Sequence, residues 1–252
     1  MGKEMKSKTW AKILGVTAVL IAGVAFATSD YVDSSEWNYR ITVEIETPEG
    51  IKTGSAVRKV VARRQPQLPN PDMNPIVYEV YGEAVAINLN DKGTLFSLIN
   101  WDSYKDVLNA LPFHTNDLSE RLKYYRNVKP GTKANLEKDI PGFAFFKNID
   151  DPKTFTPVRS DEWERILGAG IHLRKIEIEI TDQPVTWTIE NTLPPFAPGK
   201  GFIEWQRTLP YGDPRIFGLD NFKRTNKKFN QEEFEKSLLG TVESYKAKGN
   251  GL

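Results

Sequence analysis

The chain has 252 residues, and its 34 lysines and arginines almost balance its 33 aspartates and glutamates, giving a formal net charge of +1. A balance this even excludes the strongly basic surface that draws in nucleic acid, so we expect no nucleic-acid partner. The sequence contains no cysteine, which excludes disulfide bonds, thiolate catalysis, cysteine zinc sites and iron–sulfur clusters.

The N-terminal segment, residues 1–27, has the layout of a secretory signal peptide. Lysines form a basic head, and an uncharged apolar stretch follows from Ile13 to Phe26. Small side chains at Ala25 and Ala27 then mark a cleavage site before Thr28. An uncleaved membrane anchor is the alternative, because the charge-free span continues to Ser29 and a spanning helix needs at least about 17 apolar residues.

In both interpretations the basic head stays in the cytoplasm, because positive charges beside an apolar segment set its orientation. We therefore expect the rest of the chain to be periplasmic, or anchored to the inner membrane and facing the periplasm. Membrane contact through the N-terminal segment is expected only if that segment is uncleaved.

Strict alternation of apolar and polar residues predicts a strand from Trp37 to Ile45, with one apolar and one charged face. Residues 47–50 have the composition of a tight turn, because proline fixes φ and glycine tolerates positive φ. The segment from Ile51 to Arg64 is expected to fold back as the second strand of a hairpin. A loop rich in proline follows, from Gln65 to Pro75.

The segment from Tyr78 to Leu89 predicts one further strand. Gly82 lies where its apolar phase shifts, which indicates a β-bulge. Turn residues at 90–93 connect this strand to a partner over 94–99. The sequence thus predicts three or four antiparallel strands that are consecutive along the chain.

Apolar residues at helical spacing predict one helix over 104–111 and a second over 118–125. Thr115 or Asn116 is the expected N-cap of the second helix. A loop-rich stretch from Lys129 to Pro157 follows, and we expect its phenylalanines to fill the core.

A short helix is expected to begin at Asp161, because Asp161 and Glu164 resemble a capping box, and to stop at 168–170. Alternating isoleucines then predict a strand from Ile171 to Thr181. We expect this strand to join the N-terminal sheet despite the distance along the chain.

From Leu193 to Gly218 the composition changes to proline, glycine and aromatic residues, which predicts an ordered arm over the domain rather than a flexible linker. Phe202, Trp205 and Tyr211 of this arm are candidate binding aromatics. Asn230 and Glu233 predict the start of a C-terminal helix.

These elements together predict an α+β fold. It consists of an antiparallel sheet of about five to six strands, with three to four short helices on one side and the C-terminal arm and helix added. The expected division is a signal peptide or anchor over 1–27, a β-rich core domain over 28–192, and the arm with its helix over 193–252.

Three stretches carry a resemblance to known proteins: Tyr39–Val57 (YRITVEIETPEGIKTGSAV), Gly82–Leu98 (GEAVAINLNDKGTLFSL) and Phe146–Pro184. They resemble an uncharacterised family of small exported or membrane-anchored bacterial proteins of unknown function. The resemblance covers roughly half of the chain after residue 27. It implies a common fold and export, and it implies no mechanism or site residue.

The sequence lacks the usual catalytic and cofactor motifs: the phosphate-binding and dinucleotide-binding glycine loops, the zinc-protease motif and the serine-hydrolase elbow. No catalytic residue can be assigned, and we expect no cofactor and no metal. The only histidines, His114 and His172, are interpreted as surface or cap residues. The doublet Asp150 and Asp151 is interpreted as the start of a turn.

Basic clusters over 58–64 and 223–228 are interpreted as solvated surface, with contact to anionic lipid or an acidic partner as the alternative. Three functional hypotheses follow. We favour a non-enzymatic envelope protein that binds or assembles with an envelope partner. A hydrolase that acts on envelope polymer through unmarked carboxylates and a module that binds a small molecule or lipid are the alternatives.

Overall fold

The structure is a computed structural model that describes residues 34–65, 74–159, 161–193, 205–216 and 221–225. The chain forms two compact units. The described residues of unit 1 lie within 34–37, 60–79 and 113–128, and those of unit 2 lie within 38–59, 80–112 and 129–225. Among the described residues no helix is long and apolar enough to cross a membrane.

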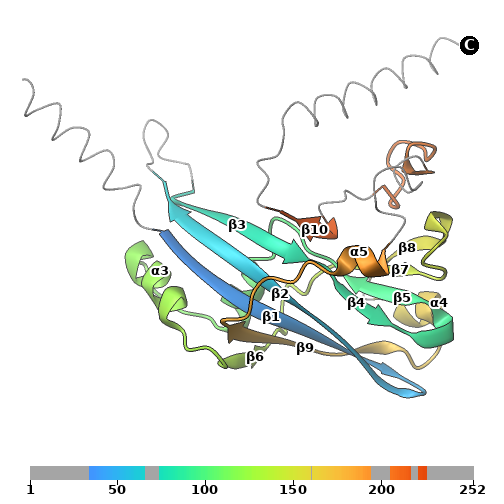
Figure 1. The fold of residues 1–252 in the computed structure, drawn as a ribbon, viewed down its shortest axis with the longest axis horizontal. Coiled ribbons are helices and arrows are strands. Elements are labelled where there is room, and N and C mark those ends of the chain that lie inside the picture. The colour runs from blue at the N-terminus through green and yellow to red at the C-terminus, as the bar shows by residue number, and fades with distance from the viewer. Residues whose placement is uncertain (1–33, 66–73, 160, 194–204, 217–220, 226–252) are drawn as a thin grey trace, which may run out of the picture. The chain divides into compact units, whose positions relative to one another are not determined.

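A six-stranded sheet has the strand order β10-β3-β2-β1-β9-β6 (Figure 1). β9 pairs antiparallel with β1, from Asn38 opposite Thr181 to Glu46 opposite His172, so the predicted long-range pairing is confirmed. The strands are β1 (Ser34–Thr47), β2 (Gly50–Arg64), β3 (Ile76–Glu83), β6 (Lys133–Asn135), β9 (His172–Thr181) and β10 (Lys223–Arg224).

The alternation in β1 has the predicted effect, because buried side chains alternate along it with partly or fully exposed ones. Its apolar face is fully buried, including Tyr39, Ile41 and Val43. At the predicted turn the Thr47 hydroxyl donates to the Gly50 carbonyl at 2.7 Å, and Gly50 has φ of +113°. The expected hairpin of β1 and β2 is therefore confirmed.

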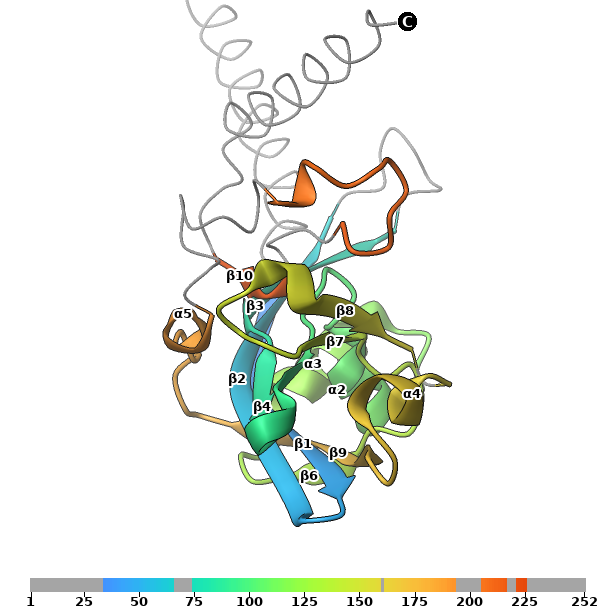
Figure 2. The same ribbon diagram turned by 90° about the vertical axis from the view of Figure 1, so that its right-hand side faces the viewer.

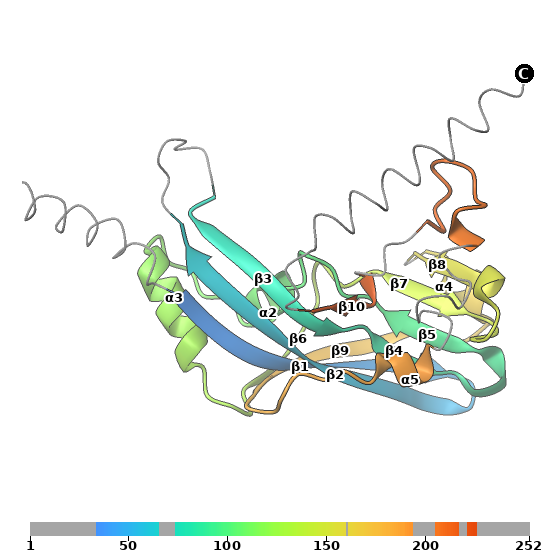
Figure 3. The same ribbon diagram turned by 45° about the horizontal axis from the view of Figure 1, so that its top comes forward.

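A second sheet, with four antiparallel strands in the order β4-β5-β7-β8, lies within unit 2 (Figure 3). Its short strands are packed through buried aromatic and aliphatic side chains. At one edge, β8 contains Pro157, which lies opposite Ala144 of β7. The strands are β4 (Val85–Asn88), β5 (Thr94–Ser97), β7 (Phe143–Phe146) and β8 (Phe155–Val158).

The prediction of one bulged strand from Tyr78 to Leu89 was wrong. This segment forms β3 and β4, which belong to different sheets and are separated at Ala84. The shift of apolar phase at Gly82 marks this change of sheet. Gly82 has φ of +136°, and a Cβ there would lie 3.0 Å from Cγ of Arg58, so only glycine fits without strain.

The stretch from Lys129 to Pro157 was predicted as loop, but it contains β6, β7 and nearly all of β8. Its phenylalanines fill the core as expected. Phe146 contacts Phe96 and Phe155 edge to face, with ring centroids 5.8 and 5.2 Å apart. Phe222 of the C-terminal arm belongs to the same buried cluster.

Short helices accompany the sheets: α4 lies against β8 (Figure 2), and α5 lies beside β4 (Figure 1). A 3₁₀ turn, Asn90–Lys92, joins β4 to β5, and a second, Pro152–Thr154, precedes β8. The α-helices are α2 (Lys105–Ala110), α3 (Leu118–Asn127), α4 (Trp163–Leu167) and α5 (Ile189–Thr192). The predicted C-terminal helix lies outside the described residues.

Two predicted helix caps were wrong. The N-cap of α3 is Asp117, whose carboxylate accepts the backbone N–H groups of Ser119 and Glu120 at 2.8 and 3.2 Å. The N-cap of α4 is Glu162, with no side-chain hydrogen bond, so Asp161 does not cap this helix. The α3 helix thus begins one or two residues later than the expected caps imply, and the Asp117 carboxylate satisfies two of its first amides.

Unit 1 packs α3 against the start of β1. The rings of Trp37 and Tyr125 stack with centroids 5.3 Å apart, and the Ser35 hydroxyl donates to the Leu122 carbonyl at 2.9 Å. Burial raises the pKa of Tyr125 to about 12, so this phenol is neutral.

Candidate functional site

Unit 2 carries a groove of about 440 Å³ between α4, the first residues of β9 and the segment that leads into β7. We call it the α4 groove. Its lining combines apolar side chains with acidic and basic ones: Ile140, Asp161, Trp163, Glu164, Arg165, His172 and Leu173.

The floor of the α4 groove is rigid. Trp163 is only 6% exposed, and its ring contacts the buried Phe143 edge to face at a centroid distance of 4.9 Å. Gly168 and Gly170 have φ of +111° and +74°, which lets the chain turn sharply from α4 into β9. This local turn brings the tryptophan of α4 and the start of β9 to one groove.

The rim of the groove carries acidic and basic side chains that already have polar partners. The Arg165 guanidinium contacts the Glu162 carboxylate, and His172 Nε2 lies 3.4 Å from Oε2 of Glu46. Glu164 accepts the Gly170 amide at 3.4 Å. These groups are largely hydrated, so their pairs contribute little to stability and remain available to a ligand.

One edge of β9 is open beside the groove. β6 pairs with β9 only from Lys133 opposite Glu179 to Asn135 opposite Glu177. The Leu136 amide adds one bond to the Ile176 carbonyl at 2.9 Å. In the part of the chain that the structure describes, no strand pairs with the outer edge of β9 over residues 172–175.

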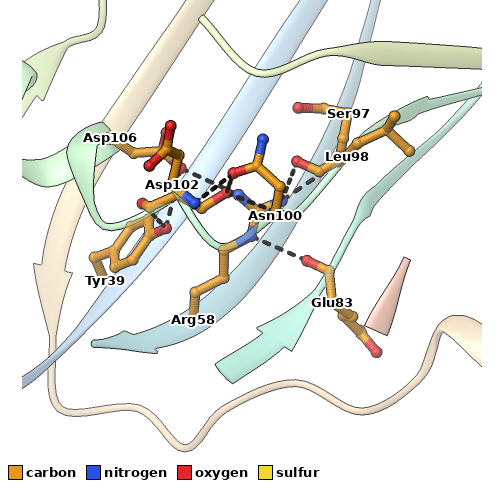
Figure 4. A network of polar contacts seen from close by, with 9 residues as sticks. Tyr39, Arg58, Glu83, Ser97, Leu98, Asn100, Asp102 and Asp106 are labelled. Carbon is orange, nitrogen blue, oxygen red and sulfur yellow. Dashed lines mark hydrogen bonds and ion pairs between the residues drawn. The ribbon is translucent and has the colours of Figure 1, made fainter. Parts of the chain in front are cut away.

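A second polar cluster in unit 2 is entirely buried (Figure 4). The Arg58 side chain, with 0% exposure, donates from Nη1 to Oδ2 of Asp106 at 3.1 Å and from Nε to the Glu83 carbonyl at 3.0 Å. Its Nη2 donates to the carbonyls of Ser97 and Leu98 at 3.3 and 3.2 Å. We call Arg58, Asp106 and Tyr39, with these carbonyls, the Arg58 network.

Tyr39 completes this network, since its hydroxyl lies 2.9 Å from the Ser103 carbonyl and 3.0 Å from Oδ2 of Asp106. Burial raises the pKa of Asp106 to about 6, although the Arg58 charge and the hydrogen bonds act in the opposite direction. Burial raises the pKa of Tyr39 well above its usual value, so the phenol stays protonated.

The Arg58 network holds secondary structure together instead of contacting a substrate. It joins β1, β2, the start of α2 and the end of β5, and its side chains have no access to solvent. The interpretation of residues 58–64 as solvated surface was therefore wrong for Arg58. The signal in the sequence was Gly82, whose missing side chain makes room for this arginine.

The candidate aromatics of the C-terminal arm have separate environments. Trp205 is half-buried on the second-sheet core, 6.5 Å from the Phe155 ring, with the Arg215 guanidinium 5.8 Å from its own ring. Tyr211 is 91% exposed. Phe202 lies outside the described residues, as do the cleavage residues Ala25, Ala27 and Thr28.

The remaining sequence candidates behave as structural or surface groups. His114 is exposed in unit 1, and His172 lies on the rim of the α4 groove. Asp151 accepts the Lys153 amide at 3.0 Å and caps a 3₁₀ turn, as its interpretation as a turn start predicted. Across the described ranges, no cluster of three or more histidines and carboxylates could hold a metal ion.

No protein-family model matches this chain, and neither a curated protein nor a solved structure matches it. The resemblance to exported bacterial proteins stays a prediction. The function has to be argued from the N-terminal sequence and from the geometry of the α4 groove.

Proposed function

We propose that this chain is an exported or membrane-anchored protein of the bacterial envelope, and that its folded part is a non-enzymatic binding or assembly module. The basic head, apolar stretch and cleavage-like residues of 1–27 support export. The α4 groove supports binding, and it is the observation that carries this half of the proposal.

The groove has the features of a recognition site. Its tryptophan floor is fixed by the core, which reduces the entropy lost when a ligand is ordered. Its rim supplies polar groups that select orientation, and the adjoining edge of β9, which no strand of the described residues covers over 172–175, supplies backbone donors and acceptors. Because groove and edge are continuous at His172 and Leu173, an elongated ligand fits better than a compact one.

A carboxylate-dependent hydrolase is the second candidate, because Asp161 and Glu164 line the same groove. The Asp161 side chain is 73% exposed, whereas the catalytic carboxylates of glycoside hydrolases flank the scissile bond inside a site that encloses the substrate. Binding is therefore the better interpretation. Hydrolysis of an envelope polymer that is lost in both D161N and E164Q would favour the enzyme instead.

Export can be tested with a single introduced thiol, because the chain has no cysteine of its own. Tyr211, at 91% exposure, is a suitable site. We expect Y211C in intact spheroplasts to react with a membrane-impermeant maleimide, and intact-mass measurement to show whether residues 1–27 are removed. Labelling only after lysis would contradict export.

Binding can be tested with a photocrosslinking amino acid at His172, on the groove rim, and at Arg63, an exposed control position in unit 1. We expect irradiated envelopes to give a discrete adduct of higher mass from position 172 and none from position 63. Equal adducts at both positions, or none at either, would overturn the binding module.

A further inference from the structure

One row of charges alternates in sign across three neighbouring strands of the six-stranded sheet, β1, β9 and β6. Arg40 of β1, Glu179 of β9 and Lys133 of β6 are aligned in register. Arg40 Nη1 lies 3.0 Å and Lys133 Nζ lies 3.6 Å from Oε2 of Glu179. The row therefore reads positive, negative, positive, which is the favourable order for cross-strand neighbours.

A second row starts with the opposite sign and lacks its third member. Glu44 of β1 is aligned with Lys175 of β9, and Oε1 of Glu44 lies 3.2 Å from the lysine Nζ. Lys175 donates hydrogen bonds to the carboxylates of Glu44 and Glu177, which raise the pKa of Lys175 and keep it charged. In the described part of the chain, β6 ends before this row, so the outer edge of β9 ends in a cation.

The backbone is irregular at the same place. Lys175 pairs with Glu44 and Leu173 pairs with Ile45, so Arg174 is an extra, bulged residue. Its guanidinium lies 3.6 Å from Glu44, so one carboxylate faces two cations of β9. Bulges are frequent next to binding sites because they redirect side chains.

We propose that residues 172–175 of β9, together with the α4 groove, bind an extended acidic segment of a partner protein by strand addition. This inference rests on the proposed function as a binding module. Carboxylates of the added strand complete the row begun by Glu44 and Lys175, and its backbone bonds to the open edge of β9. An apolar side chain of the same segment enters the groove against Ile140 and Trp163.

A second copy of the chain is a poorer occupant of this edge. Antiparallel pairing of residues 172–175 with themselves would bring Arg174 and Lys175 of one copy close to the same residues of the other. Like charges on facing strands are destabilising, and such charges protect edges against self-association. The edge is therefore selective for a partner of opposite charge.

The probe is a fluorescein-labelled peptide of alternating glutamate and valine, titrated with the full chain and followed by anisotropy. We expect this peptide to bind, and to bind more weakly at about 0.5 M salt because charge screening is stronger. A lysine–valine peptide should not bind. A glutamate–valine peptide N-methylated at alternate residues should bind about tenfold more weakly, because it cannot donate to the strand edge.

Variants of the chain locate the site. We expect the double variant R174Q/K175Q to bind the glutamate–valine peptide about tenfold more weakly, since the pairing charges are lost. I140S, at the groove, should weaken binding independently because the apolar contact is lost, and R63Q, in unit 1, is the matched control that should bind as the wild type does. Circular dichroism confirms that each variant is folded.

Unchanged affinity in R174Q/K175Q, or for the N-methylated peptide, would overturn strand addition at β9. A peptide that fails to bind, while position 172 still gives envelope adducts, would overturn the acidic segment and leave the proposed function standing. Loss of both signals would overturn both. A shift of the free chain to a dimer that is broken by R174Q/K175Q would replace the acidic partner with a second copy.

Discussion

Two arginine–carboxylate pairs in unit 2 have nearly the same geometry and different surroundings. Arg58 and Asp106 are 3.1 Å apart with side chains 0% and 5% exposed, and Arg40 and Glu179 are 3.0 Å apart with side chains 26% and 18% exposed. The side chains of the first pair are almost completely buried, so their hydrogen bonds come from the other groups of the Arg58 network. The second remains hydrated and belongs to the face that we propose for recognition. The distance between the charged atoms therefore does not predict how much an ion pair affects stability, whereas the burial of its side chains does.

The largest expected effect comes from breaking the buried pair. R58M should lower the free energy of unfolding by about 3–5 kcal/mol, because the buried Asp106 carboxylate would lose its cation and three backbone carbonyls would lose the guanidinium donor. Urea denaturation measures this change. R40M is the matched control, and we expect it to cost less than about 1 kcal/mol because water replaces the lost partner. Equal effects of the two variants would remove the distinction between the pairs.

The pKa of Asp106 predicts a pH dependence that only the buried pair has. Its folded value of about 6 exceeds the unfolded value, so the folded state binds a proton more tightly. This group therefore destabilises the fold above pH 6, and that cost disappears as the pH falls from about 6 to about 4.

Unfolding free energies of the wild type and D106N at pH 7 and pH 4 test this expectation. The difference between the two proteins should change by about 2–3 kcal/mol over that range, whereas D161N, at an exposed carboxylate, should follow the wild type. Parallel profiles of the wild type and D106N would mean that Asp106 does not titrate in this window.

A substitution at Gly82 tests whether the Arg58 side chain needs the space that the missing Cβ of this glycine leaves. G82A places a Cβ 3.0 Å from the arginine Cγ at a φ of +136°, and we expect a loss of about 2 kcal/mol from strain and displacement. G142A is the matched control, because its Cβ would lie 3.8 Å from the nearest atom of Leu98. Thermal unfolding that is equal for both variants would argue against a tight fit at Gly82.

The smallest expected effect is on the hydrated row of charges. E179Q should lower the unfolding free energy by less than about 1 kcal/mol, because Arg40 and Lys133 can both turn to water. The loss should shrink further at about 1 M salt, where the Debye length is about 3 Å. A loss as large as that of R58M would show that this row is part of the core instead.

Sequence patterns predicted the strands that have one solvent-exposed face and one buried face. β1 and β9 alternate strictly, so their strands and their shared sheet could be inferred. β7 is buried along its whole length, and a continuous apolar run such as Phe143–Phe146 carries no period to identify it. β7 and β8 were therefore not predicted, whereas β4 and β5 lie within predicted strands that were expected to belong to a single sheet.

Less of the candidate site than of the fold could be predicted from the sequence. Arg58 belongs to a basic run, and no local pattern separates a buried arginine from exposed ones. The α4 groove combines Ile140 with α4 and the start of β9, and that proximity depends on tertiary packing. Trp163 was part of an expected helix, yet only its contact with Phe143 shows that it forms a floor.

Pro157 at the outer edge of the second sheet limits what kind of assembly this molecule can form. Proline has no amide hydrogen, so an incoming strand at β8 would meet a missing donor. A molecule with two receptive edges could add copies or partners at each in turn and grow into a filament. The proline therefore disfavours strand addition at β8, and the partner strand that we propose adds at residues 172–175 of β9 instead.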